Sequence, residues 1–381
     1  MKRMLREADH RLGRLAGPRR VLVEARTPVH LAVLGSIIDG LQRDPRVSVF
    51  VTGGDSPLVR KAFESAGPVR CRWIDRTGAS WQRFDLLING DPWGTIDLRR
   101  CRHRLNFFHG VAGKYGLDCP ADMPAGFDTY TRIAFANRDR MSRYLSAGIV
   151  TPSQAALVGY PKLDALVRGA FQPATVRRSL GLDPLRPTVL FAPTWSTASA
   201  LHVAGEAIIE ALLDADFNVI AKLHDRSLQT SERFTGGIDW RVRLSRFATS
   251  STDARFALAE GVDSSPYLAA ADAMVTDHSS IGFEYCTLDR PLIVFDVPDL
   301  PRVARINPEK IALLRSAATV TRTPADVVEA VRSELAAPAR LGETRRRVAA
   351  EMFFEPGTAT DRALHICYDL LELDFAREEA A

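Results

Sequence analysis

The stretch Thr276-Asp277-His278-Ser279-Ser280-Ile281-Gly282-Phe283-Glu284-Tyr285 lies between two apolar runs, at residues 270–275 and 290–296. The first run predicts a helix end that leads into a buried strand, and the second predicts another buried strand. The order strand, tight turn, short helix, strand is typical of an α/β fold with a parallel sheet.

Two serines stand where the short helix should begin. The free backbone N–H groups and the dipole at a helix N-terminus favour an anion, and serine hydroxyls can cap the helix or donate to a phosphate. Glu284 follows Ser280 by four residues, one too many for a capping box, and it could face a ligand. We therefore assign Asp277, Ser279, Ser280 and Glu284 as donor-binding residues of a site for a phosphate-bearing ligand. A well-capped helix without a ligand is the alternative.

The rest of the chain alternates short apolar runs with helical periods, which indicates parallel βαβ units. A proline-rich segment at 161–187 separates two such series and predicts an interdomain connection. We expect an α/β architecture of two Rossmann-like domains that face each other across a cleft. The predicted parts are an acceptor domain at 1–165, a nucleotide-donor domain at 188–358, and a helix at 359–381 that packs back toward the first domain. Ligands of open α/β sheets bind at the carboxyl ends of the strands.

The composition is that of an ordinary globular protein, with 46% hydrophobic and 25% charged residues and a net charge of +4 over 381 residues. This mild charge does not indicate a nucleic-acid partner. The five cysteines are few, odd in number and show no zinc-type spacing, so we predict reduced thiols in a cytoplasmic protein. The sequence contains no metal-binding motif, and we expect no cofactor. No apolar run reaches the roughly 18 residues of a membrane-spanning helix.

The N-terminal residues 2–20 are basic, and Leu5, Leu12 and Leu15 fall on one helical face. Such a segment could hold the protein at an anionic membrane surface, on the inner face of the plasma membrane. A solvated helix or a frayed tail is the alternative.

A histidine-containing loop follows the predicted strand at residues 105–108. His109 precedes Gly110, which lets the backbone turn sharply or approach a ligand. A neutral histidine at this position can act as a general base toward a hydroxyl, and Lys114 could hold a phosphate. We assign His109 as catalytic and Gly110 and Lys114 as acceptor-binding, with a buried structural histidine as the alternative.

Two further loops leave predicted strands in the second half. Thr194 offers a hydroxyl and Trp195 a stacking surface, and both follow the strand at 188–191. Lys222 and His224 fall on one side of the next strand, where His224 fits a pyrophosphate, with a structural histidine as the alternative. We assign His224 as catalytic and Thr194, Trp195 and Lys222 as donor-binding. We expect no convergent partners for His30, His103, His202 and His365.

At these residues the sequence resembles the CDP-glycerol glycerophosphotransferase family, the teichoic-acid primases and polymerases with a GT-B fold. The resemblance covers roughly positions 85–300 and rests on the order and spacing of five segments. They are Phe108-His109-Gly110, Gly159-Tyr160-Pro161-Lys162-Leu163-Asp164, Leu190-Phe191-Ala192-Pro193-Thr194-Trp195, Lys222-Leu223-His224, and Thr276-Asp277-His278-Ser279-Ser280 through Glu284 and Pro291.

The resemblance implies that His109 is the catalytic base and that His224 contacts the donor pyrophosphate. It also implies that Ser279 and Ser280 bind donor phosphate and that Glu284 holds the ribose. The sequence departs from the family pattern at several positions. They are Val111-Ala112 after Gly110, Asp225 after His224, His278 in place of tyrosine, and Glu284 where an aspartate is usual.

The expected function is transfer of a glycerophosphate or related polyol phosphate from a CDP-linked donor, without a metal, to a hydroxyl of a lipid-linked or polysaccharide acceptor. This reaction would serve cell-envelope polymer synthesis. Two alternatives stay open: a sugar-nucleotide glycosyltransferase or epimerase of the same fold, and a non-catalytic nucleotide- or polysaccharide-binding protein.

Overall fold

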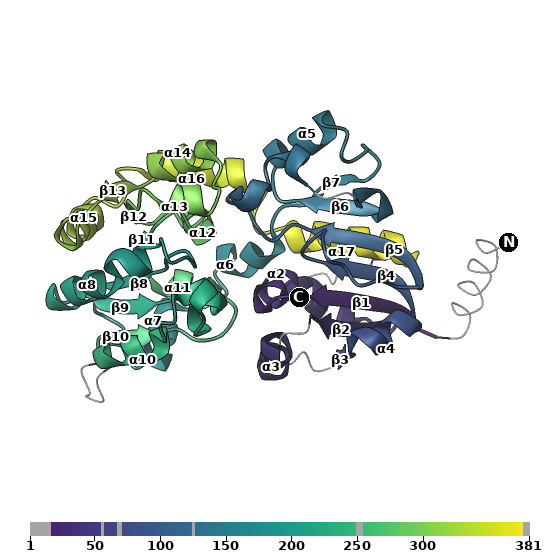
Figure 1. The fold of residues 1–381 in the computed structure, drawn as a ribbon, viewed down its shortest axis with the longest axis horizontal. Coiled ribbons are helices and arrows are strands. Elements are labelled where there is room, and N and C mark those ends of the chain that lie inside the picture. Colours follow the sequence, from purple (N-terminus) through teal and green to yellow (C-terminus); the bar gives the residue numbers. More distant parts are fainter. Residues whose placement is uncertain (1–16, 55–56, 67–70, 124–125, 249–253, 376–381) are drawn as a thin grey trace. The chain divides into compact units, whose positions relative to one another are not determined.

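A computed structural model describes residues 17–54, 57–66, 71–123, 126–248 and 254–375. Most of the basic N-terminal segment for which membrane binding is expected, residues 2–16, lies outside the described residues. Contacts divide the chain into two compact units (Figure 1). Among the described residues, unit 1 comprises those up to His109, Met123–Asp164 and those from Phe354 onward, and unit 2 comprises Gly110–Asp122 and Ala165–Phe353.

Unit 1 is built on a seven-stranded parallel sheet in the order β3-β2-β1-β4-β5-β6-β7. The strands are β1 (Arg19–Ala25), β2 (Val47–Gly53), β3 (Arg72–Trp73), β4 (Arg83–Asn89), β5 (Arg100–Phe107), β6 (Arg132–Phe135) and β7 (Ala155–Leu157). The central strand β1 is buried on both faces at Val21, Leu22 and Val23, as a near-continuous apolar run requires.

The helices of unit 1 connect these strands. They are α2 (Pro28–Arg43), α3 (Pro57–Ala66), α4 (Arg76–Trp81), α5 (Arg138–Ser146) and α17 (Ala359–Leu371), with short 3₁₀ turns at Phe127–Thr129 and Pro161–Leu163. Helix α2 begins with Pro28, which suits the first helical turn because its missing N–H has no partner there.

Unit 2 contains a six-stranded parallel sheet in the order β10-β9-β8-β11-β12-β13. The strands are β8 (Thr188–Phe191), β9 (Asn218–Ala221), β10 (Phe256–Leu258), β11 (Ala273–Thr276), β12 (Leu292–Phe295) and β13 (Thr319–Thr321). The strand order reverses between β8 and β11, which is the switch point where open α/β sheets bind ligands. The predicted α/β fold with two parallel-sheet domains is thus confirmed.

The helices of unit 2 separate these strands along the chain. They are α6 (Asp164–Val167, whose first residue belongs to unit 1), α7 (Pro173–Ser179), α8 (Ala200–Asp214), α9 (Glu232–Thr235), α10 (Trp240–Leu244), α11 (Ser265–Ala270), α12 (Ser280–Cys286), α13 (Leu300–Val303), α14 (Pro308–Ser316), α15 (Pro324–Ala336) and α16 (Gly342–Met352). The short turns are 3₁₀ helices at Lys114–Gly116, Pro120–Asp122, Asp225–Leu228 and Ser245–Phe247.

The segment Gly110–Asp122 belongs to unit 2, whereas the sequence analysis placed all of residues 1–165 in the first domain. Hydrogen bonds explain the difference. The Tyr115 N–H donates to the Ala304 carbonyl at 3.3 Å, and the Asn307 N–H donates to the Gly113 carbonyl at 3.4 Å. The segment is therefore held by side chains and backbone far along the chain, which sequence proximity does not reveal.

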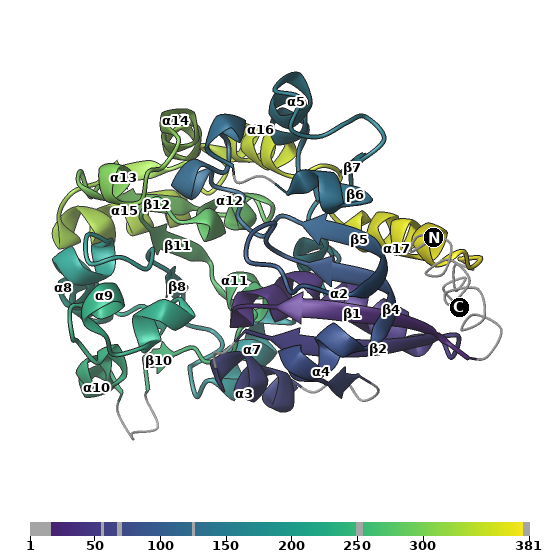
Figure 2. The same ribbon diagram turned by 45° about the vertical axis from the view of Figure 1, so that its right-hand side comes forward.

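Helix α17 packs in unit 1 against α2, and both views show it running along this unit (Figures 1 and 2). The buried carboxylate of Asp164 anchors the start of α17. It accepts N–H groups from Gly357 at 2.8 Å, Ala359 at 3.2 Å and Thr360 at 2.6 Å. One aspartate from the middle of the chain thus satisfies three donors that precede or open this helix.

We expect Asp164→Ala to lower the free energy of unfolding by about 2–4 kcal/mol, because three N–H groups lose a charged acceptor. Chemical denaturation followed by circular dichroism measures this change. Asp369→Ala, on the exposed face of the same helix, is the matched control and should stay within about 0.5 kcal/mol of the parent. Equal effects of the two substitutions would contradict an anchoring role for Asp164.

Candidate active site

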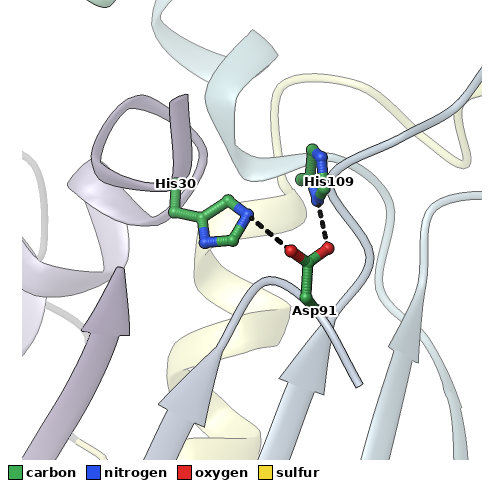
Figure 3. A group of neighbouring side chains, drawn as sticks. All are labelled: His30, Asp91 and His109. Atoms are coloured by element: carbon green, nitrogen blue, oxygen red, sulfur yellow. Dashed lines mark ion pairs between the residues drawn. The ribbon is translucent and has the colours of Figure 1, made fainter. Parts of the chain in front are cut away.

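Three side chains meet at the carboxyl edge of the unit 1 sheet (Figure 3). Asp91 follows β4, His109 follows β5, and His30 lies in the first turn of α2. Because β4 and β5 are neighbouring parallel strands, the residues that follow them lie side by side. One ligand-type atom from each of the three side chains lies within 4.8 Å of the other two.

The Nδ1 atom of His109 faces two oxygen acceptors. It lies 2.8 Å from Asp91 Oδ1 and 3.1 Å from the Gly90 carbonyl oxygen. Both partners can only accept, so the proton of the neutral ring belongs on Nδ1 and the lone pair on Nε2. The His109 side chain is 28% exposed, so a solute can reach it. A histidine oriented by a carboxylate in this way is suited to accept a proton through Nε2.

The carboxylate of Asp91 stays charged although its side chain is only 10% exposed. Burial alone would raise the pKa of Asp91, but the charges and hydrogen bonds of His109 and His30 together outweigh burial and lower it. Asp91 thus supplies a fixed negative charge beside both imidazoles.

The expectation that His30 has no convergent partner is wrong. His30 Nε2 lies 3.3 Å from Asp91 Oδ2, and the His30 and His109 ring centroids are 4.6 Å apart. His30 and His109 are far apart in the chain, so no local pattern could pair them. The sequence did offer one signal, because Asp91 stands shortly after the apolar run Leu86-Leu87-Ile88, as His109 stands after the predicted strand at 105–108.

A hydrogen-bonded chain of polar side chains underlies this corner of the sheet. The Asn106 amide donates to Asn89 Oδ1 at 2.7 Å, and the Asn89 amide donates to the Tyr130 hydroxyl at 2.8 Å. A separate bond runs from the Tyr160 hydroxyl to the His109 carbonyl at 3.0 Å. These bonds fix the ends of β4 and β5, and with them the backbone that carries Asp91 and His109.

The second group of candidate residues lies at the carboxyl edge of the unit 2 sheet. Thr194 and Trp195 follow β8, Lys222 and His224 follow β9, and Asp277 follows β11. These three strands are neighbours in the sheet, with β8 in the middle. The structure therefore brings together residues that the sequence analysis proposed from three separate loops.

Asp277 links two of these loops. Its buried carboxylate accepts the Thr194 N–H at 2.9 Å, the Thr194 hydroxyl at 2.6 Å and the Ala200 N–H at 3.1 Å. With three partners and no exposed surface, Asp277 holds Thr194 and the start of α8 in place. We had assigned Asp277 to the donor directly; the geometry gives it a supporting part instead.

Lys114 lies in unit 2 beside Thr194, although we had assigned it to the acceptor domain. Its Nζ donates to Thr194 Oγ1 at 2.9 Å. Burial lowers the pKa of Lys114 to about 8, and the charge of Asp277 only partly offsets this effect. Gly110, the other residue assigned to the acceptor, has no space for a side chain, because a Cβ atom there would lie 2.7 Å from Leu117 Cδ1.

Trp195 is surrounded by side chains that stack on it. Tyr115 is nearly parallel to it with ring centroids 5.8 Å apart, and the Arg226 guanidinium carbon lies 4.2 Å from its ring centroid. His224 lies next to Trp195, at 6.1 Å between centroids. Trp195 thus forms the centre of an aromatic and cationic cluster.

His224 is neutral near physiological pH, because burial lowers its pKa to about 4 despite the nearby Asp225 charge. Its Nδ1 accepts the Arg226 N–H at 3.1 Å. The ring proton therefore belongs on Nε2, and His224 can offer a neutral N–H donor to a ligand rather than a positive charge. Lys222 Nζ is bound to backbone carbonyls at Leu223 and Gly261.

Ser279 is the N-cap residue of α12, and its hydroxyl makes no capping hydrogen bond. Ser280 is the first helical residue, and Glu284 is buried one turn further along. Helix α12 is only 7 residues long, so the serine hydroxyls matter more here than its dipole. The hydroxyls of Ser279 and Ser280 follow β11 at the same sheet edge as Thr194 and His224.

A family model described as CDP-Glycerol:Poly(glycerophosphate) glycerophosphotransferase matches residues 129–363, more than half of the chain. The chain belongs to this family. The family proposed from the sequence motifs is thereby confirmed, and with it the prediction that the protein is an enzyme. The match to this glycerophosphotransferase family spans the candidate residues from Thr194 to Glu284, whereas those up to Lys114, including His30, Asp91 and His109, lie outside it.

Solved structures share the fold. The wall teichoic acid polymerase TagF is 15% identical with a TM-score of 0.69, over 93% of this chain and 89% of that chain. A putative UDP-N-acetylglucosamine 2-epimerase from Listeria monocytogenes is 13% identical with a TM-score of 0.60, over 96% of this chain and all (100%) of the other. No curated protein sequence matches this glycerophosphotransferase-family chain. Among the described residues, no helix has the length and apolar character needed to cross a membrane.

Proposed function

We propose that this glycerophosphotransferase-family protein transfers glycerophosphate from CDP-glycerol to a hydroxyl of a lipid-linked or polysaccharide acceptor in cell-envelope polymer synthesis. The observation that carries the proposal is the family match over residues 129–363. A TagF variant of the same fold was studied after a soak with CDPG, which supports the choice of donor.

The proposed reaction is a displacement at phosphorus. The acceptor oxygen attacks the phosphorus that carries glycerol, and a new P–O bond forms while the P–O bond to CMP breaks. The acceptor proton passes to Nε2 of His109, the ring nitrogen that holds the lone pair when Nδ1–H donates to Asp91. CMP leaves with the negative charge of the broken bond, so atoms and charge balance.

The donor side of the proposal uses groups of unit 2. The hydroxyls of Ser279 and Ser280, the Nε2–H of His224 and the ammonium of Lys114 can all donate to phosphate oxygens. Such donors stabilise the charge that builds up on CMP as it leaves. Glu284 is proposed to hold the ribose hydroxyls. This arrangement needs no metal ion, so turnover should persist after treatment with a chelator.

A direct assay separates this proposal from the two alternatives. Release of CMP from CDP-glycerol in the presence of a glycerophosphate-primed lipid, followed by ³¹P NMR, supports the proposal. Conversion of UDP-N-acetylglucosamine without turnover of CDP-glycerol would support an epimerase. Binding of either nucleotide without any turnover would support a non-catalytic role.

Loss of both serine hydroxyls should weaken donor binding. We expect Ser279→Ala with Ser280→Ala to reduce affinity for CDP-glycerol by about 1–3 kcal/mol, because two hydrogen bonds to charged oxygens are lost. The affinity of this double variant for cytidine should change little, because cytidine carries no phosphate. Glu284→Ala should weaken the binding of both CDP-glycerol and cytidine. Isothermal titration calorimetry measures both ligands, and Ser333→Ala on the exposed face of α15 is the control. Unchanged CDP-glycerol affinity in the folded double variant would refute the phosphate assignment.

The near-neutral pKa of Lys114 predicts a pH dependence of donor binding. A lysine with a pKa of about 8 is charged below that pH and loses its charge as pH rises through it. Affinity for CDP-glycerol should therefore fall between about pH 7 and pH 9, a range in which the phosphodiester charges of the donor stay constant. Lys114→Arg should flatten this dependence because arginine stays charged. If the affinity of the parent and of Lys114→Arg for CDP-glycerol changed with pH in the same way, the titrating group would be another residue.

The base assignment predicts a loss of rate without a loss of donor affinity. We expect His109→Ala to lower kcat about a hundredfold or more, as for removal of a general base, while the Kd for CDP-glycerol changes less than about twofold. Steady-state kinetics with calorimetry on the same samples measures both quantities. If donor affinity falls and kcat at saturating donor is kept, His109 is a binding residue and the base lies elsewhere.

A further inference from the structure

Two imidazoles flank one carboxylate in the group His30, Asp91 and His109 (Figure 3). This composition fits two kinds of chemistry. Two histidines and an aspartate can bind a divalent transition-metal ion, and they can also form a line of hydrogen bonds that fixes where protons lie. The donors and acceptors around each ring decide between the two.

The surroundings of His30 fix its tautomer. The Arg26 backbone N–H donates to His30 Nδ1 at 3.2 Å, so Nδ1 carries the lone pair. The ring proton of neutral His30 therefore belongs on Nε2, 3.3 Å from Asp91 Oδ2. This contact is longer than the one between Asp91 and His109, and its angle is not that of a formed hydrogen bond. His30 Nε2 is buried and makes no hydrogen bond among the described residues, and Asp91 Oδ2 is the acceptor that lies within reach of its proton. His30 is completely buried, and burial lowers its pKa, which keeps the ring neutral.

The same contacts disfavour a metal ion. A histidine that binds a metal through Nε2 almost always donates Nδ1–H to an acceptor. His30 Nδ1 instead faces a backbone N–H, and two donors would be forced together if Nε2 bound a cation. A metal held beside Asp91 would have to bind His109 through Nδ1, the ring atom that lies near this carboxylate. That nitrogen also faces the Gly90 carbonyl, which favours a proton there instead of a metal.

We propose that His30 and Asp91 are positioning residues that act on His109 through a line of hydrogen bonds. His30 donates Nε2–H to Asp91 Oδ2, Asp91 Oδ1 accepts Nδ1–H from His109, and the His109 lone pair is thereby fixed on Nε2. The effect on catalysis rests on the proposed function, in which His109 is the base, whereas the proton positions do not depend on it. Gly90 is part of this arrangement, because a Cβ atom there would lie 3.0 Å from the His30 ring.

Two further groups of the described chain bear on this line. Arg26, between β1 and α2, disfavours a second proton on His30 through its charge. The Tyr160 hydroxyl is bound to the His109 carbonyl. The Asp91 carboxylate lies in direct contact with His109 Nδ1, so its charge favours protonation of His109.

The first experiment reads the tautomers without any enzyme assay. In the full-length protein labelled with ¹⁵N-histidine, two-dimensional ¹H–¹⁵N NMR near pH 7.5 should show His30 as the Nε2–H form and His109 as the Nδ1–H form. His30→Gln and His109→Gln assign the signals. The Nδ1–H form of His30, or shifts of both rings on addition of equimolar Zn²⁺ that are lost in Asp91→Asn, would overturn the proposal in favour of a metal site.

The second experiment measures the effect on catalysis with CDP-glycerol. Asp91→Asn removes the charge and can turn the His109 ring to the other tautomer, so kcat should fall about a hundredfold or more at unchanged donor Kd. The acid limb of the pH–rate profile should also move to lower pH, because the protonated form of His109 loses its stabilising charge. A purely structural role for Asp91 would lower activity without moving that limb.

Substitutions of His30 complete the test. His30→Leu should lower kcat about tenfold and move the acid limb slightly to higher pH, because Asp91 is then bound by one donor fewer. His30→Gln, which can place an amide N–H near the position of Nε2, should recover most of the loss. His103→Leu is the control for loss of a unit 1 histidine outside the site, since His103 is half-buried and has a threonine partner.

The outcomes separate this inference from the proposed function. No turnover of CDP-glycerol by the parent protein, with the expected NMR tautomers, would refute the proposed function and leave the proton positions intact. Normal turnover with equal kcat and equal pH profiles in the parent, Asp91→Asn and His30→Leu would refute the inference and leave the proposed function intact.

Discussion

A carboxylate can be buried only where hydrogen bonds and opposite charge replace its water, and three aspartates show how this constraint organises both units. Asp91 is bound by two histidines, Asp277 by Thr194 and Ala200, and Asp164 by the backbone at the start of α17. Leaving such a charge without partners costs several kcal/mol, so each aspartate strongly restricts where its partners can lie. Asp91 and Asp277 each lie just past a strand, at the sheet edge of their own unit that carries candidate active-site residues. There the requirement for partners holds the groups proposed to do chemistry in fixed positions.

The same physical balance separates the roles of the histidines. Burial favours the neutral form of His224, and the nearby Asp225 does not reverse this, so the pKa stays near 4 and the ring serves as an N–H donor. His109 is more exposed and lies in direct hydrogen-bonding contact with a carboxylate, which suits a group that must gain a proton during the reaction. The residue type alone therefore does not set the role; the partner of the Nδ1 atom does. His224 Nδ1 accepts a backbone N–H, whereas His109 Nδ1 faces the Asp91 carboxylate and the Gly90 carbonyl.

Much of the fold could be predicted from the sequence because its central strands are short, continuous apolar runs. The range expected for β8, residues 188–191, agrees with the structure, and β11 and β12 form at the two apolar runs expected to be strands. The side chains of all three strands are buried. The edge strands β3, β10 and β13 were not predicted. They contain two or three residues each, too few for a recognisable apolar run, and β3 and β13 mix polar with apolar side chains. An edge strand tolerates this because it has only one neighbour and a partly exposed surface.

The candidate site was predictable only as far as each residue lay beside a strand end. Ser279, His224 and His109 could be found this way, because parallel strands deliver the residues that follow them to one edge. His30 could not, since it opens a helix and meets Asp91 only through the tertiary fold.

Lys114 illustrates the opposite error, because it is close to His109 in sequence but is bound in unit 2. Two left-handed residues direct its segment there: Gly113, where a Cβ atom would overlap Asp118, and Tyr115, whose φ of 56° costs about 1–3 kcal/mol. The stacking of Tyr115 on Trp195 and its N–H bond to Ala304 offset that strain. The backbone after His109 therefore takes its course from contacts with residues far along the chain, and these contacts, rather than distance along the sequence, decide which unit Lys114 serves.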